Sequence, residues 1–250
     1  MSAAPRLGHS GGPPQSARTL ATPSAMQFFL DTASLDAIRR WQAFGLVDGC
    51  TTNPALLAKE GGDPLRQLEE VAELVAGPVS AQVTCDDAPG MTRQGRALAE
   101  VAPNIVVKVP ATQPGFAAAR ELSGAGCKVN VTLAFQPSQA LPFARIPVAY
   151  VSLILGRVED FGHSSVHEVE TARALFDRLK TPTKLLVASL RNPTQLNAAV
   201  AGGADVVTVP PSTWELVYAN PHSLQGERDF AAAWHGLPEN ARRAYEQLGG

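Results

Sequence analysis

Eight short runs of apolar residues recur along the chain, and segments with a helical pattern separate them. The runs occupy residues 27–30, 47–51, 78–83, 104–109, 128–133, 149–155, 184–189 and 204–209. Several are rich in valine and isoleucine, the composition of strands that are buried on both faces of a parallel sheet. Eight strand–helix units in about 200 residues predict an α/β fold, a compact (β/α)8 TIM barrel in a single domain.

A doubly wound sheet is the alternative fold for such an alternation. That fold usually carries a G-x-G-x-x-G turn after its first strand, and no such turn follows residues 27–30. The sequence also lacks a P-loop pattern. The barrel is therefore the predicted fold.

Helix starts are marked between the runs by capping residues, often followed by proline. They are Ser34, Asp63-Pro64, Ala88-Pro89, Gln136-Pro137 and Asn192-Pro193. Residues 165–168, SVHE, have the serine-to-glutamate spacing of a capping box.

The first 25 residues differ from the rest, because they are dominated by Pro, Gly, Ser and Ala and contain no acidic residue. We expect residues 1–25 to be a disordered tail and residues 26–250 to form the barrel with a C-terminal helix. The tail lacks the apolar core of a secretory signal. A transit peptide is the alternative, although the prolines and glycines disfavour an amphipathic helix.

Composition limits the partners of the chain. The net charge of −2 and the absence of a basic stripe give no support for binding to nucleic acid. No stretch approaches the roughly 20 apolar residues of a membrane span. The three cysteines are odd in number and far apart, which favours a reducing compartment, the cytoplasm.

Polar residues lie at almost every predicted strand end. In a barrel, the carboxyl ends of the strands meet at one mouth, where catalytic groups project. The candidates are Asp31, Thr51, Thr52, Asn53, Gln82, Thr84, Lys108, Asn130, Thr132, Ser152, Arg157, Ser189 and Arg191. So many polar groups at one mouth predict a binding or catalytic site.

Lys108 is the most informative of these residues, because it interrupts the run IVVKV at 105–109. Burial favours the neutral amine, and nearby arginines would lower its pKa further. A neutral amine attacks a ketone or aldehyde carbonyl to give a Schiff base, whose protonated imine accepts electrons when a neighbouring bond breaks. The alternative is a lysine whose ammonium reaches water at the strand end.

Seven segments together carry a family resemblance. They are FFLDTAS (28–34), GCTTNPALL (49–57), SAQV (80–83), IVVKVPAT (105–112), NVTLAF (130–135), GR (156–157) and ASLRNP (188–193). In register from Phe28 to about Trp234, the chain resembles the transaldolase family, including its small fructose-6-phosphate aldolase branch. The resemblance implies a barrel enzyme of carbohydrate metabolism with a Schiff-base lysine on the fourth strand and no cofactor.

The resemblance also implies a role for each candidate in binding a sugar-phosphate substrate. Lys108 would form the Schiff base, Asp31 would act as general base and then acid, and Gln82 and Thr132 would hold a water that shuttles protons. The other positions would bind substrate: Asn53, Asn130, Ser152 and Thr51 near the dihydroxyacetone unit, and Arg157, Ser189 and Arg191 at the phosphate.

Some of these residues have simpler explanations. Asp31 could cap the first helix, and Asn53-Pro54 could be a turn that starts a helix. Arginines on loops are usually solvated, so a phosphate-binding role for Arg157 and Arg191 is supported only because they form a pair beside Ser189. His163 and His167 lie four residues apart, but they lack the further ligands that a zinc site needs, so no metal is expected.

Among the positions that depart from the usual pattern of the family, two bear on the reaction. Typical transaldolases have glutamate at the position of Gln82, and the aldolase branch has glutamine. Ile154 stands where transaldolases have phenylalanine and the aldolases have a proton-donating tyrosine. We therefore predict transfer of a dihydroxyacetone unit from a ketose phosphate to an aldose acceptor. The alternatives are an aldolase-type lyase that releases free dihydroxyacetone, or a sugar-phosphate-binding barrel with weak activity.

The C-terminal segment predicts self-association. FAAAW at 230–234 places Phe230 and Trp234 one helical turn apart. It resembles the extra helix through which small members of the family form rings, so a homo-oligomer is expected. The alternative is that this apolar stripe folds back on its own barrel.

Overall fold

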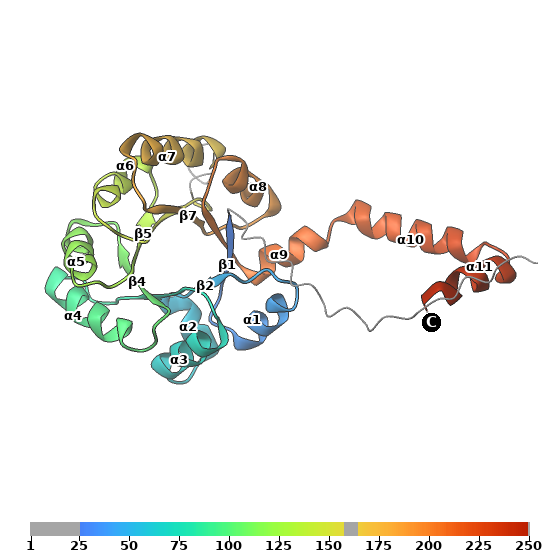
Figure 1. The fold of residues 1–250 in the computed structure, drawn as a ribbon, viewed down its shortest axis with the longest axis horizontal. Coiled ribbons are helices and arrows are strands. Elements are labelled where there is room, and N and C mark those ends of the chain that lie inside the picture. The colour runs from blue at the N-terminus through green and yellow to red at the C-terminus, as the bar shows by residue number, and fades with distance from the viewer. Residues whose placement is uncertain (1–25, 158–164, 250) are drawn as a thin grey trace, which may run out of the picture.

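The computed structural model describes residues 26–157 and 165–249. Eight parallel strands close into a barrel in the order β1 to β8, and helices surround them, as Figure 1 shows. The predicted TIM barrel is therefore confirmed. The expected tail at residues 1–25 lies outside the described residues, as do His163 and the side chain of Ser165, on which the capping box depends. No helix in the described ranges has the length and apolar character needed to cross a membrane.

The strands coincide with the eight apolar runs of the sequence. Their bounds are β1 Gln27–Asp31, β2 Gly49–Thr51, β3 Val79–Gln82, β4 Ile105–Pro110, β5 Val129–Ala134, β6 Tyr150–Ile154, β7 Lys184–Ala188 and β8 Val206–Val209. Each strand pairs in parallel with its neighbours, and β8 pairs with β1 to close the ring. The pairing of β5 with β6 shifts between Val131 and Ala134, beside the positive φ of Leu133 (63°).

Alternate strand residues divide the core into two parts, because successive side chains of a strand point to opposite faces. The outward set, with Leu30, Val107 and Val187 among its members, packs in the large cluster that holds the helices against the barrel. The inward set forms a smaller cluster, of which Phe29, Tyr150 and Leu186 are the bulkiest members. Toward the mouth, the inward positions include the polar Thr51, Lys108 and Asn130 as well as the apolar Ile154 and Ala188.

Helices follow the strands, with further helices after β2 and β8. Their bounds are α1 Leu35–Gln42, α2 Pro54–Glu60, α3 Pro64–Leu74, α4 Ala88–Ala99, α5 Gln113–Gly124, α6 Pro137–Ala140, α7 Ser165–Leu179, α8 Pro193–Ala201, α9 Pro211–Tyr218, α10 Pro221–His235 and α11 Glu239–Glu246. The predicted caps Ser34, Asp63 and Asn192 accept backbone N–H groups as expected. The cap of α4 is Asp87, so Ala88-Pro89 are its first two helical residues.

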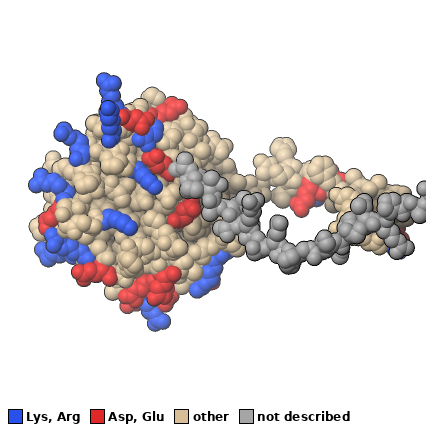
Figure 2. Space-filling view, in the orientation of Figure 1, with Lys and Arg blue, Asp and Glu red and all other residues tan. Residues whose placement is uncertain are grey.

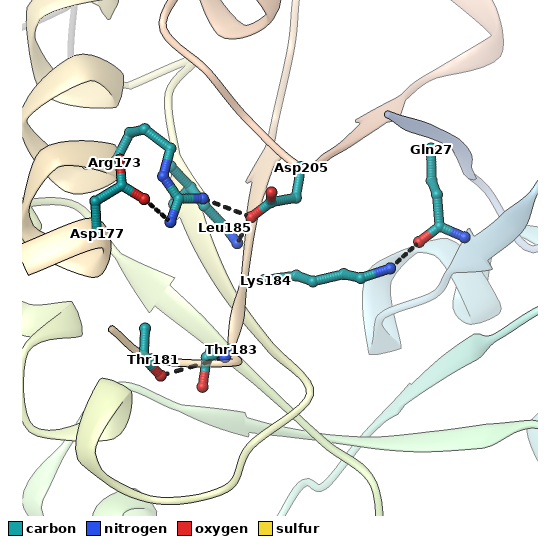
Figure 3. Close-up of polar contacts among 8 residues, drawn as sticks. All are labelled: Gln27, Arg173, Asp177, Thr181, Thr183, Lys184, Leu185 and Asp205. Atoms are coloured by element: carbon teal, nitrogen blue, oxygen red, sulfur yellow. Dashed lines mark hydrogen bonds and ion pairs between the residues drawn. The ribbon is translucent and has the colours of Figure 1, made fainter. Parts of the chain in front are cut away.

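The amino ends of β7 and β8 are held together by a polar network at the base of the barrel. Arg173 of α7 pairs with Asp205 at 2.8 Å, and the same carboxylate accepts the backbone N–H of Leu185 at 2.7 Å (Figure 3). Lys184 donates to Gln27 Oε1 at 2.7 Å, which links β7 to β1. These contacts lie at the opposite end of the strands from the mouth, so they serve the fold.

The last helices leave the barrel as an arm. Figure 1 shows α10 and α11 extending away from the ring beyond α9, and no residue of either helix is buried. In Figure 2, acidic and basic side chains are interspersed over the barrel, whereas the part of the arm next to it shows mostly uncharged surface. The fold-back of the FAAAW stripe onto its own barrel is therefore wrong for this structure.

Candidate active site

A cavity of about 400 Å³ opens at the carboxyl ends of the strands, where the sequence placed the polar candidates. Its lining includes nine of them: Asp31, Thr51, Asn53, Gln82, Lys108, Thr132, Ser152, Arg157 and Ser189. Because a barrel brings these strand ends to one rim, residues more than 150 positions apart in sequence share one cavity. We call this cavity the mouth pocket.

Lys108 is buried, with 7% of its surface exposed, so the snorkelling alternative is wrong. Its Nζ donates a hydrogen bond to the backbone oxygen of Thr52 at 3.1 Å. Burial lowers the pKa of Lys108, and the nearby carboxylate of Asp31 opposes this effect, with a smaller opposing contribution from Cys50. Arginines do not contribute to the shift, contrary to the sequence-based expectation. The site therefore favours a neutral, nucleophilic amine.

Asp31 lies in the same pocket, at the end of β1. Burial raises the pKa of its carboxyl group, and Lys108, a hydrogen bond from Thr51 and the charge of Lys59 oppose the rise. The Thr51 hydroxyl donates to Asp31 Oδ1 at 2.7 Å. Asp31 does not cap the first helix, because that position belongs to Ser34. A carboxyl group in these surroundings can exchange a proton with a bound ligand.

The floor of the site is a chain of buried polar side chains below the mouth pocket. Asn130 Nδ2 donates to Ser80 Oγ at 3.0 Å, and Asn130 Oδ1 accepts from Ser152 Oγ at 2.7 Å. Asn130 is fully buried and does not line the mouth pocket, whereas Ser152 does. These two bonds fix the orientation of the amide, so any group that Asn130 offers a ligand is presented from below Ser152.

Gln82 stands between two cavities. It lines the mouth pocket, as Thr132 does, and it also lines a second cavity of about 560 Å³ that is bounded by residues of α2, α3 and α4. Thr84 was predicted at the mouth, but it lines the second cavity instead, because β3 ends at Gln82 and the chain then turns outward. Gln82 and Thr132, the two residues expected to hold a water, both line the mouth pocket.

Asn53 is a helix cap, as one interpretation of its sequence position predicted, and it also lies at the mouth of the barrel. Its Oδ1 accepts the backbone N–H of Leu56 at 3.0 Å and caps α2, and the residue also lines the mouth pocket. Since the cap uses the oxygen, the amide nitrogen is the group that Asn53 can offer to a ligand. Thr52 lies behind it, donating to the Ser80 backbone oxygen at 2.8 Å.

The basic side of the site combines two arginines with an unusual backbone. Arg157 and Ser189 line the mouth pocket, and Ser189 has a positive φ of 62°. Arg191 does not line the pocket, although it lies close by: a Cβ on Gly156 would approach its Nε within 3.1 Å and the Ser189 backbone oxygen within 2.0 Å. Glycine at 156 therefore permits the close approach of the two loops that carry the arginines.

Several lining residues were not singled out as site residues from the sequence. They are Thr208 of β8, Leu133, Phe135, Ala188, Pro54 and Ala55. Thr208 could have been found from the alternation of β8, because Val206 and Thr208 share the inward face. Leu133 could not, since its position depends on the shift in the β5–β6 pairing. Leu133, Phe135 and Ile154 give one wall of the pocket an apolar character.

A metal site has no support in the described ranges 26–157 and 165–249. Within them, no group of three or more His, Cys, Asp or Glu side chains is arranged to hold an ion. The chemistry of the mouth pocket is instead that of an amine, a carboxylate, amides and hydroxyls.

Comparisons with known proteins agree with this geometry. Residues 28–247 match the family model described as transaldolase/fructose-6-phosphate aldolase. A probable transaldolase of Caulobacter sp. (strain K31) is 41% identical, covering 86% of this chain and 99% of the relative. A probable transaldolase of Exiguobacterium sibiricum is 44% identical, covering 84% of this chain and 98% of the relative.

Solved structures with little sequence similarity share the fold. The carboxyl transferase domain from Rhizobium etli pyruvate carboxylase, solved with pyruvate, aligns with a TM-score of 0.57 at 10% identity, and the match covers 75% of this chain and 40% of that chain. A likeness at this identity reports the barrel alone. The family match and the two transaldolase relatives span nearly all of the described residues, so this chain is an enzyme that belongs to the transaldolase/fructose-6-phosphate aldolase family.

Proposed function

We propose that this protein is a transaldolase that moves a dihydroxyacetone unit from a ketose phosphate to an aldose acceptor through a Schiff base on Lys108. The observation that carries the proposal is the buried amine of Lys108, whose pKa is lowered by burial, in the same pocket as the carboxyl group of Asp31. Carbonyl attack needs a neutral amine, and this environment favours one.

The proposed reaction assigns each proton to a residue. The Lys108 amine adds to the ketone carbon of the donor, and loss of water gives a protonated imine. Asp31 takes the proton of the hydroxyl group on the carbon that departs, and the carbon–carbon bond breaks as its electrons move into the imine. The resulting enamine attacks the aldehyde of the acceptor, Asp31 returns its proton, and water releases the new ketose.

Water handling falls to Gln82 and Thr132. A water between their side chains would carry protons during formation and hydrolysis of the imine, and their shared presence in the mouth pocket supports this role. The amide nitrogen of Asn53 and the oriented amide of Asn130 would bind the hydroxyl groups of the dihydroxyacetone unit, with Ser152 and Thr51 beside them. The hydrogen bonds to Ser80 and Ser152 support a fixed orientation of Asn130.

The substrate phosphate would bind on the arginine side. Arg157 and Ser189 line the pocket, and Arg191 lies against Gly156, next to Arg157. Guanidinium groups suit phosphate because their fixed donors match its oxygens. Arg191 does not line the pocket in this structure, so its part in this site requires its side chain to reorient toward the pocket.

Ile154 favours transfer over release. After the bond breaks, the enamine on Lys108 is either protonated, which releases dihydroxyacetone, or captured by an aldose. Ile154 lines the pocket and has no proton to give, and help from a general acid is typically worth about 10²- to 10⁴-fold. We therefore favour transfer and keep the lyase as the alternative. A weakly active sugar-phosphate-binding barrel is less favoured, because the amine and carboxyl groups share one pocket.

Borohydride trapping tests the proposal. Borohydride reduction in the presence of fructose 6-phosphate should add a stable mass to the peptide that contains Lys108. Erythrose 4-phosphate should lower the amount of this adduct, because the aldose captures the enamine and product is released. Lys108→Met should abolish the adduct. The matched control is Lys184→Met, because Lys184 lies on β7 at the opposite end of the barrel and donates to Gln27 (Figure 3). An adduct on Lys59, Lys128 or Lys184 instead of Lys108 would contradict the assignment.

We also propose that the protein forms a homo-oligomer in the cytoplasm. The arm α10–α11 exposes large apolar side chains, among them Phe230 (79% exposed) and Tyr245 (67% exposed). Tyr245 packs edge-on against Trp234, with the ring centroids 5.1 Å apart, so the arm has internal structure even though it is separate from the barrel. An exposed apolar surface of this kind is typical of association sites. The three cysteines are free, which is consistent with a reducing compartment.

A further inference from the structure

Two threonine hydroxyls lie in line with the Asp31 carboxylate. β1 lies between β2 and β8 in the barrel, and each of these neighbours contributes one inward threonine. Thr51 of β2 donates to Asp31 Oδ1 at 2.7 Å, and Thr51 Oγ1 also lies 2.7 Å from Thr208 Oγ1 of β8. Both threonines are 1% exposed, and both line the mouth pocket.

The number of donor hydrogens fixes the direction of the two hydrogen bonds that link Thr208, Thr51 and Asp31. A hydroxyl group has one hydrogen to donate, and an ionised carboxylate only accepts. Thr51 uses its hydrogen for Asp31, so in its 2.7 Å contact with Thr208 it must be the acceptor. Thr208 is therefore the donor, and both hydrogens point along the chain toward Asp31.

We propose that Thr208 is a positioning residue for Asp31: by donating to Thr51, it holds the Thr51 hydroxyl as a donor to the carboxylate. This inference rests on the proposed function, in which Asp31 is the base of the carbon–carbon cleavage. Thr208 acts through Thr51, and its effect on the reaction is on the ionisation and orientation of Asp31.

The surroundings of Asp31 explain why a second hydroxyl matters. Burial raises the pKa of Asp31 and so favours its neutral form, which cannot accept a proton. The charged groups that oppose this effect are Lys108 from β4 and Lys59 from α2, and the neighbouring Cys50 thiol is itself held neutral, with its pKa raised to about 12. Hydrogen bonds in a chain polarise and strengthen one another, so Thr208 strengthens the Thr51 bond, which opposes the rise in the pKa of Asp31.

The test is the pH dependence of kcat/KM for transfer from fructose 6-phosphate to erythrose 4-phosphate. Thr208→Val replaces the hydroxyl with a methyl group of similar size. We expect the acid limb of the profile to move to higher pH, with about a 2- to 10-fold loss of kcat/KM on that limb, the worth of one hydrogen bond. Substrate KM should change little, and Thr208→Ser should restore the profile. If the valine variant does not fold, Thr208→Ala takes its place.

Two comparisons separate positioning from a general structural effect. In a Thr51→Val background the link to Asp31 is already missing, so adding Thr208→Val should produce no further movement of the acid limb. Thr183→Val is the matched control, because Thr183 lies at the base of the barrel (Figure 3). It is 2% exposed and donates to the Val148 backbone oxygen at 3.0 Å. It should lower stability and leave the pH profile unchanged.

The outcomes distinguish this inference from the proposed function. The positioning role is overturned if the acid limb of Thr208→Val lies at the same pH as that of the unmodified protein. It is also overturned if Thr208→Val moves the acid limb equally in the unmodified protein and in Thr51→Val. Borohydride trapping on Lys108 is measured in the same variants at a pH above the acid limb, where Asp31 is ionised in all of them and Lys108 faces the same charge. There it should be unaffected, because imine formation does not use Asp31 as its base. Absence of the adduct in the unmodified protein would instead refute the proposed function.

Discussion

Gly49 is the point at which one added methyl group should disturb the barrel interior most directly. It points inward on β2, level with Phe29 on β1. A Cβ built at Gly49 would lie 2.6 Å from Cε1 of Phe29 and 2.8 Å from two further ring atoms. The ring would have to move by more than about half an ångström to reach an ordinary contact distance, since optimal carbon–carbon separations are roughly 3.5–4.0 Å.

Phe29 has little room for that movement. Its side chain is fully buried, and Tyr150 packs edge-on against it with ring centroids 5.7 Å apart. Inserting a methyl group into a filled core typically costs about 1–3 kcal/mol. For a chain of this length, each kcal/mol lowers Tm by roughly 2–4 °C, so Gly49→Ala should lower Tm by about 2–12 °C.

A double-mutant cycle provides the assay. Gly49→Ala, Phe29→Leu and the double variant are compared by urea unfolding, with Gly124→Ala as the control, because a Cβ at Gly124 meets nothing within 4 Å. Leucine leaves space where the ring was, so the double variant should be at least about 0.5 kcal/mol more stable than the sum of the single effects predicts. Additive effects within about 0.3 kcal/mol would refute the steric reasoning.

The remaining predictions concern the site and the arm. Arg157→Ala or Arg191→Ala should weaken phosphorylated donors by roughly ten- to a hundredfold in kcat/KM and leave unphosphorylated donors nearly unchanged, whereas equal losses for both would remove the phosphate role. Ile154→Tyr should raise the release of free dihydroxyacetone without an acceptor, measured by an enzyme-coupled assay; an unmodified protein that already releases it as fast without an aldose as with one is a lyase. Burial lowers the pKa of Lys108 in the folded protein, so the charged amine lowers the free energy of unfolding at low pH, and this loss disappears as pH rises toward the unfolded pKa of about 10.4. Lys108→Met should therefore be more stable than the parent in urea unfolding, with the largest difference at low pH. A difference that does not change with pH would contradict the burial argument. Phe230→Glu should convert the oligomer to a monomer in sedimentation velocity, and a monomeric parent at micromolar concentration would exclude the oligomer altogether.

The fold was predictable because local signals agreed with one another along the whole barrel. Runs such as IVVKV end within a residue or two of the observed strands, and caps such as Ser34 and Asn192 mark the observed helix starts. Each signal is local: a strand buried on both faces must be apolar throughout, and a helix needs an acceptor for its first N–H groups. The closed ring then follows from the number of units.

The candidate site was predictable to the extent that it depends on strand ends. Lys108 stood out because a lysine inside an apolar strand needs a reason. Thr84 was wrongly placed because two residues beyond a strand end the chain can turn to either side of the rim, and no local pattern reports which. Leu133 was missed because its place depends on the pairing of two strands, which is a property of the assembled barrel.

The position of Lys108 connects the stability of the barrel with its chemistry. The apolar layer around Phe29 closes the barrel below, and the layer above it, which holds Ser80, Asn130 and Lys108, satisfies its polar groups through one another or through backbone oxygens. An amine in that layer gives up most of its hydration, which disfavours the ammonium ion. The same burial raises the pKa of Asp31, and the charge of Lys108 and the hydrogen bond from Thr51 oppose that rise. One cavity thus holds both groups, with one hydrogen-bond donor, the Thr51 hydroxyl, supplied to the carboxylate and one acceptor, the Thr52 oxygen, supplied to the amine.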